Sequence, residues 1–156
     1  MKEIELTRGY KTIVDDDIYE IYNKFNWYAQ VPQQGYVRAA RKVPKSKGLI
    51  YLHRVIAKAK KEEIVDHING NPLDNRTDNL RIATKSENMC NRNKTRRNSS
   101  GVKGVTFNKK CTNRPWIAQI MINYKHIGLG SFATRDEAEF AYKSAAGKYH
   151  GSFAKL

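Results

Sequence analysis

The chain has 156 residues, enough for one domain or for two to three very small ones. Its composition, 40% hydrophobic and 28% charged, is globular rather than disordered or membrane-spanning. Lys and Arg number 29 against 15 Asp and Glu, and this net charge of +14 favours a polyanionic partner, nucleic acid first. The longest apolar run, residues 49–52, is too short to span a bilayer, and residues 1–6 lack the apolar core of a signal peptide. We therefore expect a cytoplasmic protein without membrane contact.

Positive charge is present in every part of the chain. Residues 1–48 carry nine basic and six acidic side chains, residues 49–97 carry eleven and six, and residues 98–156 carry nine and three. The stretch 92–101 is polar throughout and ends in Ser-Ser-Gly, a composition typical of a linker. The sequence therefore predicts three parts, 1–48, 49–97 and 98–156.

The first part begins with alternating apolar and polar residues that predict a hairpin over residues 3–14. Asp15–Asp17 then precede apolar residues at helical spacing. Three carboxylates could hold a metal, but they favour an N-cap and first turn. Two strands are expected at 27–31 and 36–43, joined by a turn at 33–35. Arg38 and Arg41 on the second strand either contact phosphates or lie on a solvated face.

The middle part predicts strand, loop, strand and helix within about thirty residues. Residues 64–68 form a short apolar run, residues 69–75 are rich in turn formers, and residues 79–83 can return as a second strand. A capping box, Thr84 to Glu87, then predicts a helix from Lys85 to about Lys94.

Four polar side chains in this part have the chemistry that phosphodiester hydrolysis requires. A histidine can deprotonate water near neutral pH, and carboxylate and amide oxygens can hold a divalent cation that stabilises the developing charge. The residues of these types are Asp66, His67, Asn79 and Asn88. Because neighbours on a strand point to opposite faces, Asp66 and His67 require a strand end or a bulge to reach one phosphate.

The segment from Val65 to Arg81, which reads VDHINGNPLDNRTDNLR, resembles the HNH nuclease motif, and the similarity is to its phage and intron homing-endonuclease branch. The resemblance implies a ββα-metal fold over residues 49–97. It also implies that His67 is the general base, that Asn79 holds its imidazole through the amide oxygen, and that Asp66 and Asn88 bind the metal. Asn88 replaces the third-letter histidine, so the implied ion is Mg²⁺ or Mn²⁺ rather than zinc. The implied setting is a bacterial or phage-infected cell.

From residue 98 the pattern predicts three short strands and a helix. The strands are expected at 102–107, 116–123 and 127–132, and a capping box from Thr134 to Glu137 opens a helix that Gly151 ends. Small residues on the helix allow it to lie close against the sheet. The other face of the sheet is expected to be open and basic, with DNA-binding candidates Lys103, Lys109, Lys110, Arg114 and Lys125. The alternative is that this basic face is only solvated and does not bind DNA.

This part resembles the plant apetala-two or ethylene-response-factor DNA-binding domain from about residue 100 to the end. The matching segments read GVKGV at 101–105, WIAQI at 116–120, LGSF at 129–132 and EAEFAY at 137–142. The resemblance implies that the sheet enters the major groove, with Trp116 near backbone or sugar and with Lys103 and Gln119 near phosphates or base edges. Together the parts predict an α+β protein: a β-rich N-terminal segment, an HNH module, and a three-stranded antiparallel sheet packed on one helix.

The other histidines and the cysteines have simpler interpretations. His53 is expected to pack within or cap its segment, while His126 at a hairpin turn and His150 at a helix end are expected to be ordinary surface residues. Cys90 and Cys111 have no CxxC partner, which excludes a zinc ribbon or a disulfide framework, so both are expected to be reduced.

The sequence thus predicts a site-directed, metal-dependent homing endonuclease that nicks double-stranded DNA as a monomer. A non-catalytic, sequence-specific DNA-binding protein or regulator is the main alternative. An RNA-binding module is disfavoured because no aromatic stacking platform is evident.

Overall fold

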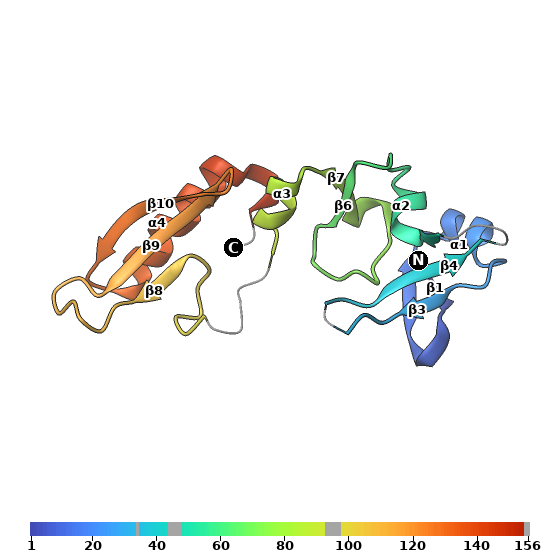
Figure 1. The fold of residues 1–156 in the computed structure, drawn as a ribbon, viewed down its shortest axis with the longest axis horizontal. Helices are drawn as coiled ribbons and strands as arrows, with labels where there is room; N and C mark the ends of the chain where they lie inside the picture. The colour runs from blue at the N-terminus through green and yellow to red at the C-terminus, as the bar shows by residue number, and fades with distance from the viewer. Residues whose placement is uncertain (34, 44–47, 93–97, 155–156) are drawn as a thin grey trace. The chain divides into compact units, whose positions relative to one another are not determined.

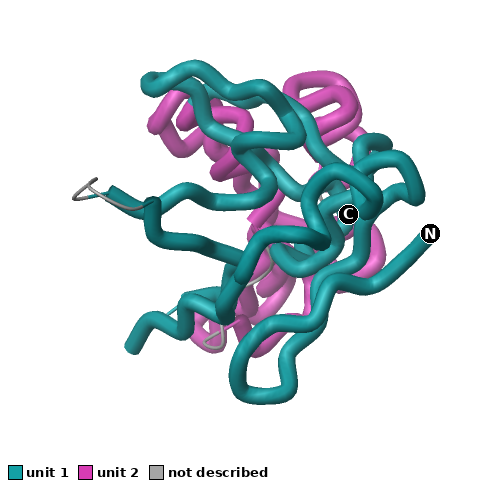
Figure 2. Tube along the Cα trace, turned by 90° about the vertical axis from the view of Figure 1, so that its right-hand side faces the viewer, with its two compact units in different colours: residues 1–84 teal, residues 85–156 magenta. Residues whose placement is uncertain are grey.

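The computed structural model describes residues 1–156 except 34, 44–47, 93–97 and 155–156. The chain divides after Thr84 into two compact units, shown in different colours in Figure 2. The order of helices and strands can be followed in Figure 1. Among the described residues, no helix combines the length and the apolar character needed to cross a membrane.

The first unit begins with the expected hairpin. Strands β1 (Lys2–Glu5) and β2 (Lys11–Val14) pair antiparallel around a 3-10 turn in which Arg8 and Gly9 adopt positive φ. Helix α1 (Asp16–Tyr22) follows directly. The expected side-chain cap from Asp15 is absent, because its carboxylate instead accepts a hydrogen bond from the backbone N–H of Thr77. Asp15 nevertheless occupies the N-cap position, and Asp16 and Asp17 lie in the first turn, as the sequence predicted.

A three-stranded sheet and a short helix complete the support. The sheet has the order β3 (Tyr28–Gln30), β4 (Arg38–Lys42), β5 (Leu49–Tyr51), and helix α2 (Leu52–Ile56) begins where β5 ends. The sequence interpretation included neither β5 nor α2, because a four-residue apolar run does not distinguish strand from helix. The core of this unit gathers apolar side chains from the hairpin, the sheet and α2: Ile4, Leu6, Val14, Trp27, Ala29, Ala39, Leu52 and Ile56.

A second hairpin carries the candidate site. Strands β6 (Ile64–His67) and β7 (Leu80–Ala83) pair antiparallel in an unbroken register, with Asp66 opposite Arg81 and His67 opposite Leu80. The connecting loop, residues 68–79, ends in a short 3-10 turn, Thr77–Asn79. His67 is the last residue of β6, so the strand end, not a bulge, separates it from Asp66.

The second unit confirms the expected sheet and helix. Helix α3 (Lys85–Cys90) comes first and is shorter than predicted: residues 91 and 92 are not helical, and Lys94 lies outside the described residues. Strands β8 (Val105–Phe107), β9 (Trp116–Ile122) and β10 (Lys125–Phe132) form an antiparallel sheet with β9 in the centre. Helix α4 (Arg135–His150) opens with the predicted capping box and ends at Gly151.

The core of the second unit lies between the sheet and α4. Ala118 and Ile120 of β9 are buried against small and aromatic residues of α4, among them Ala138 and Tyr142. Gly104 allows this close packing, because a Cβ there would lie 2.2 Å from the Tyr142 ring. The predicted α+β fold is confirmed: the described residues form small antiparallel sheets with few helices, ending in a three-stranded sheet packed on one helix.

Candidate active site

His67 is the centre of the candidate site, at the carboxyl end of β6. Its Nε2 lies 3.1 Å from Oδ1 of Asn75, and its ring lies 5.4 Å from the ring of His53, edge to face. Burial lowers the pKa of His67 below the ordinary value, although Asn75 and the nearby Asp66 and Asp74 act in the opposite direction. Burial therefore favours the neutral form of the imidazole, which can accept a proton.

His53 packs against His67, as its predicted structural role requires. It is 9% exposed, and its ring contacts Tyr51 as well as His67. Burial, with contributions from His67, Arg38 and Arg54, lowers the pKa of His53 to about 3. The uncharged aromatic ring of His53 thus lies beside the candidate base.

Asp66 is only 5% exposed, and Arg81 holds its carboxylate in place. The Nε and Nη2 atoms of Arg81 both donate to the same oxygen, Oδ2, at 2.8 and 2.7 Å. This contact joins directly opposite residues of β6 and β7, so the hairpin register itself orients the acid. The sequence interpretation missed Arg81, although its position in the Asn-Leu-Arg segment was visible.

The hydrogen bonds of Asn79 are made within the 68–79 loop, whereas the resemblance implied a contact with the His67 imidazole. Its Oδ1 accepts from the N–H of Asn69, and its Nδ2 donates to Oδ1 of Asn69 and to the carbonyl of Asp74. Asn79 therefore closes the ends of the 68–79 loop against each other. The structure gives the imidazole contact to Asn75, which the sequence interpretation did not single out, and a catalytic role for Asn79 stays a prediction.

The donor set can still be tested against the expected metal. Within the described ranges, no group of three or more His, Cys, Asp or Glu side chains is close enough to hold an ion. Mg²⁺, however, usually takes one or two protein ligands and fills its other positions with water and substrate phosphate. The carboxylate of Asp66 and the amide oxygen of Asn88 are hard donors of this kind. Asn88 lies half-buried in α3 of the second unit, and its role as a ligand stays a prediction.

The two arginines of β4 differ in their surroundings. The guanidinium of Arg41 lies over the rings of Phe25 and Trp27, 4.1 and 5.5 Å from their centroids. Arg38 lies near enough to His53 and His67 to lower the pKa of both. Arg38 of β4 thus places a positive charge near the candidate base, His67 of β6, as contact with a phosphate would require.

The DNA-binding candidates of the second unit lie in two environments. Lys109, Lys110, Arg114 and Lys125 are exposed, whereas Trp116 is half-buried against Phe107, with ring centroids 4.8 Å apart. Lys103 is not on an open face. It is half-buried, and its Nζ donates to the backbone carbonyl of Cys90 in α3.

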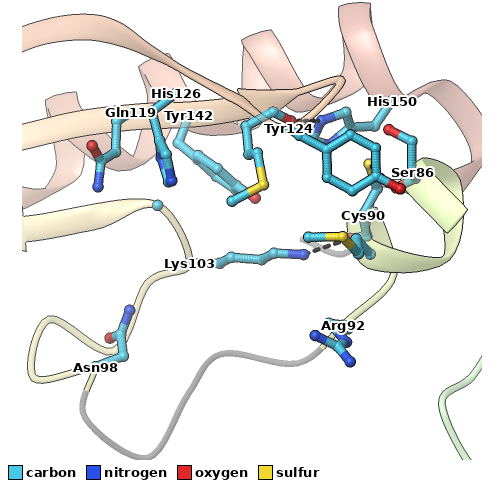
Figure 3. Close-up of a pocket in the computed structure, with 13 residues that line it drawn as sticks. Ser86, Cys90, Arg92, Asn98, Lys103, Gln119, Tyr124, His126, Tyr142 and His150 are labelled. Carbon is cyan, nitrogen blue, oxygen red and sulfur yellow. Dashed lines mark hydrogen bonds between the residues drawn. The ribbon is translucent and has the colours of Figure 1, made fainter.

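Lys103 and Gln119 line a cavity of about 330 Å³ within the second unit, together with residues of α3, β9 and α4 (Figure 3). His150 also lines it, and its Nε2 contacts the carbonyl of Met121 at 2.9 Å, so it is not the ordinary surface residue expected. His126 is exposed as expected but belongs to β10 rather than to a turn. Cys90 and Cys111 are both free and partly buried, and their reduced state stays a prediction.

Comparison with known proteins defines the class. Residues 50–90 match the HNH endonuclease family, and the hairpin β6–β7 with His67 lies within the matched residues. Protein 3.8 of Escherichia phage T7 is 32% identical over 92 residues, which cover 59% of this chain and 74% of that protein. The chain therefore belongs to the same family as this phage protein.

A second relative extends over nearly the whole chain. The uncharacterized HNH endonuclease L560 of Acanthamoeba polyphaga mimivirus is 29% identical over 153 residues, which cover 94% of this chain and 74% of that protein. No solved structure matches the chain. The similarity therefore supports a nuclease, and both of these similar proteins are encoded by viruses.

Proposed function

We propose that the protein is a metal-dependent DNA endonuclease of the homing type, which nicks one strand of its target with His67 as general base. The observation that carries the proposal is a half-buried, neutral imidazole oriented at the end of β6 within an HNH domain. A base of this kind must be unprotonated at working pH and fixed in direction; the lowered pKa of His67 and its contact with Asn75 support both.

Each side chain of the site then has a distinct task. His67 accepts the proton of the attacking water, while Asp66, oriented by Arg81, and Asn88 would hold Mg²⁺ or Mn²⁺. When bound, the ion would stabilise negative charge on the phosphate and on the leaving oxygen. Asn79 keeps the 68–79 loop closed next to the carboxyl end of β6, where His67 lies.

Recognition of DNA is assigned to the basic surface of both units. The exposed cations of the second unit, with the net charge of +14, would neutralise phosphates of a duplex, and the β8–β9–β10 sheet would enter the major groove as apetala-two-like domains do. Arg38 and Arg41 would contact the backbone near the scissile bond. One His67 per chain supports one cut per binding geometry, and hence nicking by a monomer.

The test compares cleavage and binding by His67→Ala. Replacing a positioned base is expected to lower the rate of plasmid relaxation in Mg²⁺ by about a hundredfold or more. Binding, measured by mobility shift in the presence of a chelator, should be retained. The exposed His126 offers a matched control, because His126→Ala removes an imidazole of the same size outside the HNH domain. Cleavage by His67→Ala at the wild-type rate would show that His67 is not the general base. DNA binding without any cleavage by the wild-type protein would instead favour a non-catalytic DNA-binding protein.

A further inference from the structure

A fully buried polar pair connects the N-terminal hairpin to the candidate base. Thr12 of β2 and Asn75 of the 68–79 loop are both 0% exposed. The Nδ2 of Asn75 donates to Oγ1 of Thr12 at 2.7 Å, and Oγ1 of Thr12 donates to the carbonyl of Leu73 at 2.8 Å. On the other side of the amide, Oδ1 of Asn75 lies 3.1 Å from Nε2 of His67.

The hydrogen bonds from Leu73 through Thr12 and Asn75 to His67 form a series, and the direction of each one follows from the carbonyl of Leu73 at its end. A backbone carbonyl only accepts, so the single hydroxyl proton of Thr12 must point to Leu73. Oγ1 of Thr12 can then only accept from Asn75, which requires the NH₂ side of the amide to face Thr12. The carbonyl side must therefore face His67, and because Oδ1 only accepts, Nε2 of His67 must carry a proton.

A neutral imidazole has one protonated and one unprotonated nitrogen, so a proton on Nε2 makes Nδ1 the basic atom. We propose that Thr12 and Asn75 are positioning residues that hold His67 in the Nε2–H tautomer, so that Nδ1 accepts the proton of the attacking water. The inference rests on the proposed function for the water, but the tautomer itself is a property of the protein without substrate.

The shape of the loop does not depend on this hydrogen-bond chain. The backbone N–H of Ile13 donates to the carbonyl of Leu73, and that of Asn75 donates to the carbonyl of Ile13, both at 2.8 Å. The side chain of Asn79 closes the loop independently. Removing the Thr12 hydroxyl should therefore change which way the Asn75 amide points while these other contacts keep the loop in place.

The experiment measures the tautomer directly, by two-dimensional NMR of full-length protein carrying ¹⁵N-labelled histidine. The chain has four histidines, and His67→Ala identifies the His67 signals by their loss. In wild type, at a pH where His67 is neutral, we expect a proton on Nε2 and an unprotonated Nδ1. A wild-type spectrum with the proton on Nδ1 would overturn the proposal without any variant.

Two substitutions at Thr12 then test the mechanism. Thr12→Val keeps the shape of the side chain but removes the hydroxyl, so the amide loses its preferred direction, and the Nδ1–H form of His67 should become populated. Thr12→Ser keeps the hydroxyl and should keep the Nε2–H form. The cleavage rate kcat should fall several-fold in Thr12→Val, with DNA affinity maintained.

The outcomes separate this proposal from the proposed function. A tautomer unchanged in Thr12→Val overturns the positioning role, even if the protein is a nuclease. A shifted tautomer in a protein that cuts no DNA supports the positioning role and contradicts the proposed function. Thr12→Val in the His67→Ala background should change cleavage no further, because the residue acts through the imidazole.

Discussion

Acidification should destabilise the first unit through His53. Its pKa is about 3 in the folded protein against an ordinary value of 6.5. Between these two pH values His53 is protonated in the unfolded chain but not in the folded protein. The stabilisation is complete above pH 6.5 and is lost as the pH falls toward 3. Between about pH 7.5 and about pH 4.5, this single group should remove about 3 kcal/mol of the free energy of unfolding. The lowered pKa of His67 adds an effect of the same sign.

The assay is urea unfolding at the two pH values, monitored by the fluorescence of Trp27. This tryptophan is 5% exposed in the core of the first unit, and Trp116→Phe makes it the only tryptophan of the chain. His53→Phe keeps an aromatic ring against Tyr51 and His67 but cannot titrate, so it should reduce the pH-dependent loss by about 2 kcal/mol or more. Equal losses in the two proteins would refute the reasoning, and His126→Phe, at an exposed site, serves as the control.

Three other predictions follow from the geometry of the two units. Gly104→Ala should destabilise the second unit by about 2 kcal/mol, measured by Trp116 fluorescence, because φ is +71° and the new Cβ would meet the Tyr142 ring; Gly147→Ala, with nothing within 4 Å, should be neutral or stabilising. After a chelator has removed bound metal, cleavage should return with Mg²⁺ or Mn²⁺. Robust activity with zinc alone would contradict Asp66 and Asn88 as the metal ligands. Supercoiled plasmid carrying the target should accumulate as open circles, and immediate linear product with a rate rising as the square of protein concentration would instead indicate a dimer.

The sequence predicted most of the elements because their signals are local. The capping box at Thr134 and the turn-rich loop after His67 each depend on a few neighbouring residues, and the structure confirms both. Helix α1 ends at Tyr22, three residues before the last apolar position at helical spacing, Phe25, which packs against the core and against the Tyr22 ring.

The partners within the site could not be predicted in the same way. The contact between Thr12 and Asn75 joins residues 63 positions apart, and no spacing rule relates them. Asn75 and Asn79 are the same residue type in one loop, so only the fold decides which of them faces the imidazole and which closes the loop. Asp66 and Arg81 are opposite each other in the hairpin register, so their pairing follows once the two strands are aligned.

The backbone hydrogen bonds between Ile13 of β2 and residues Leu73 and Asn75 also have a consequence for how the protein folds. The strand leaves the ribosome early, yet its backbone partners Leu73 and Asn75 are made about sixty residues later, so this contact closes a long loop late in folding. A fragment limited to residues 49–97 would contain the HNH motif without the strand against which its loop is shaped. Fragment complementation is therefore a natural way to follow assembly: a peptide of residues 1–48 should restore native spectra to a separately made remainder of the chain.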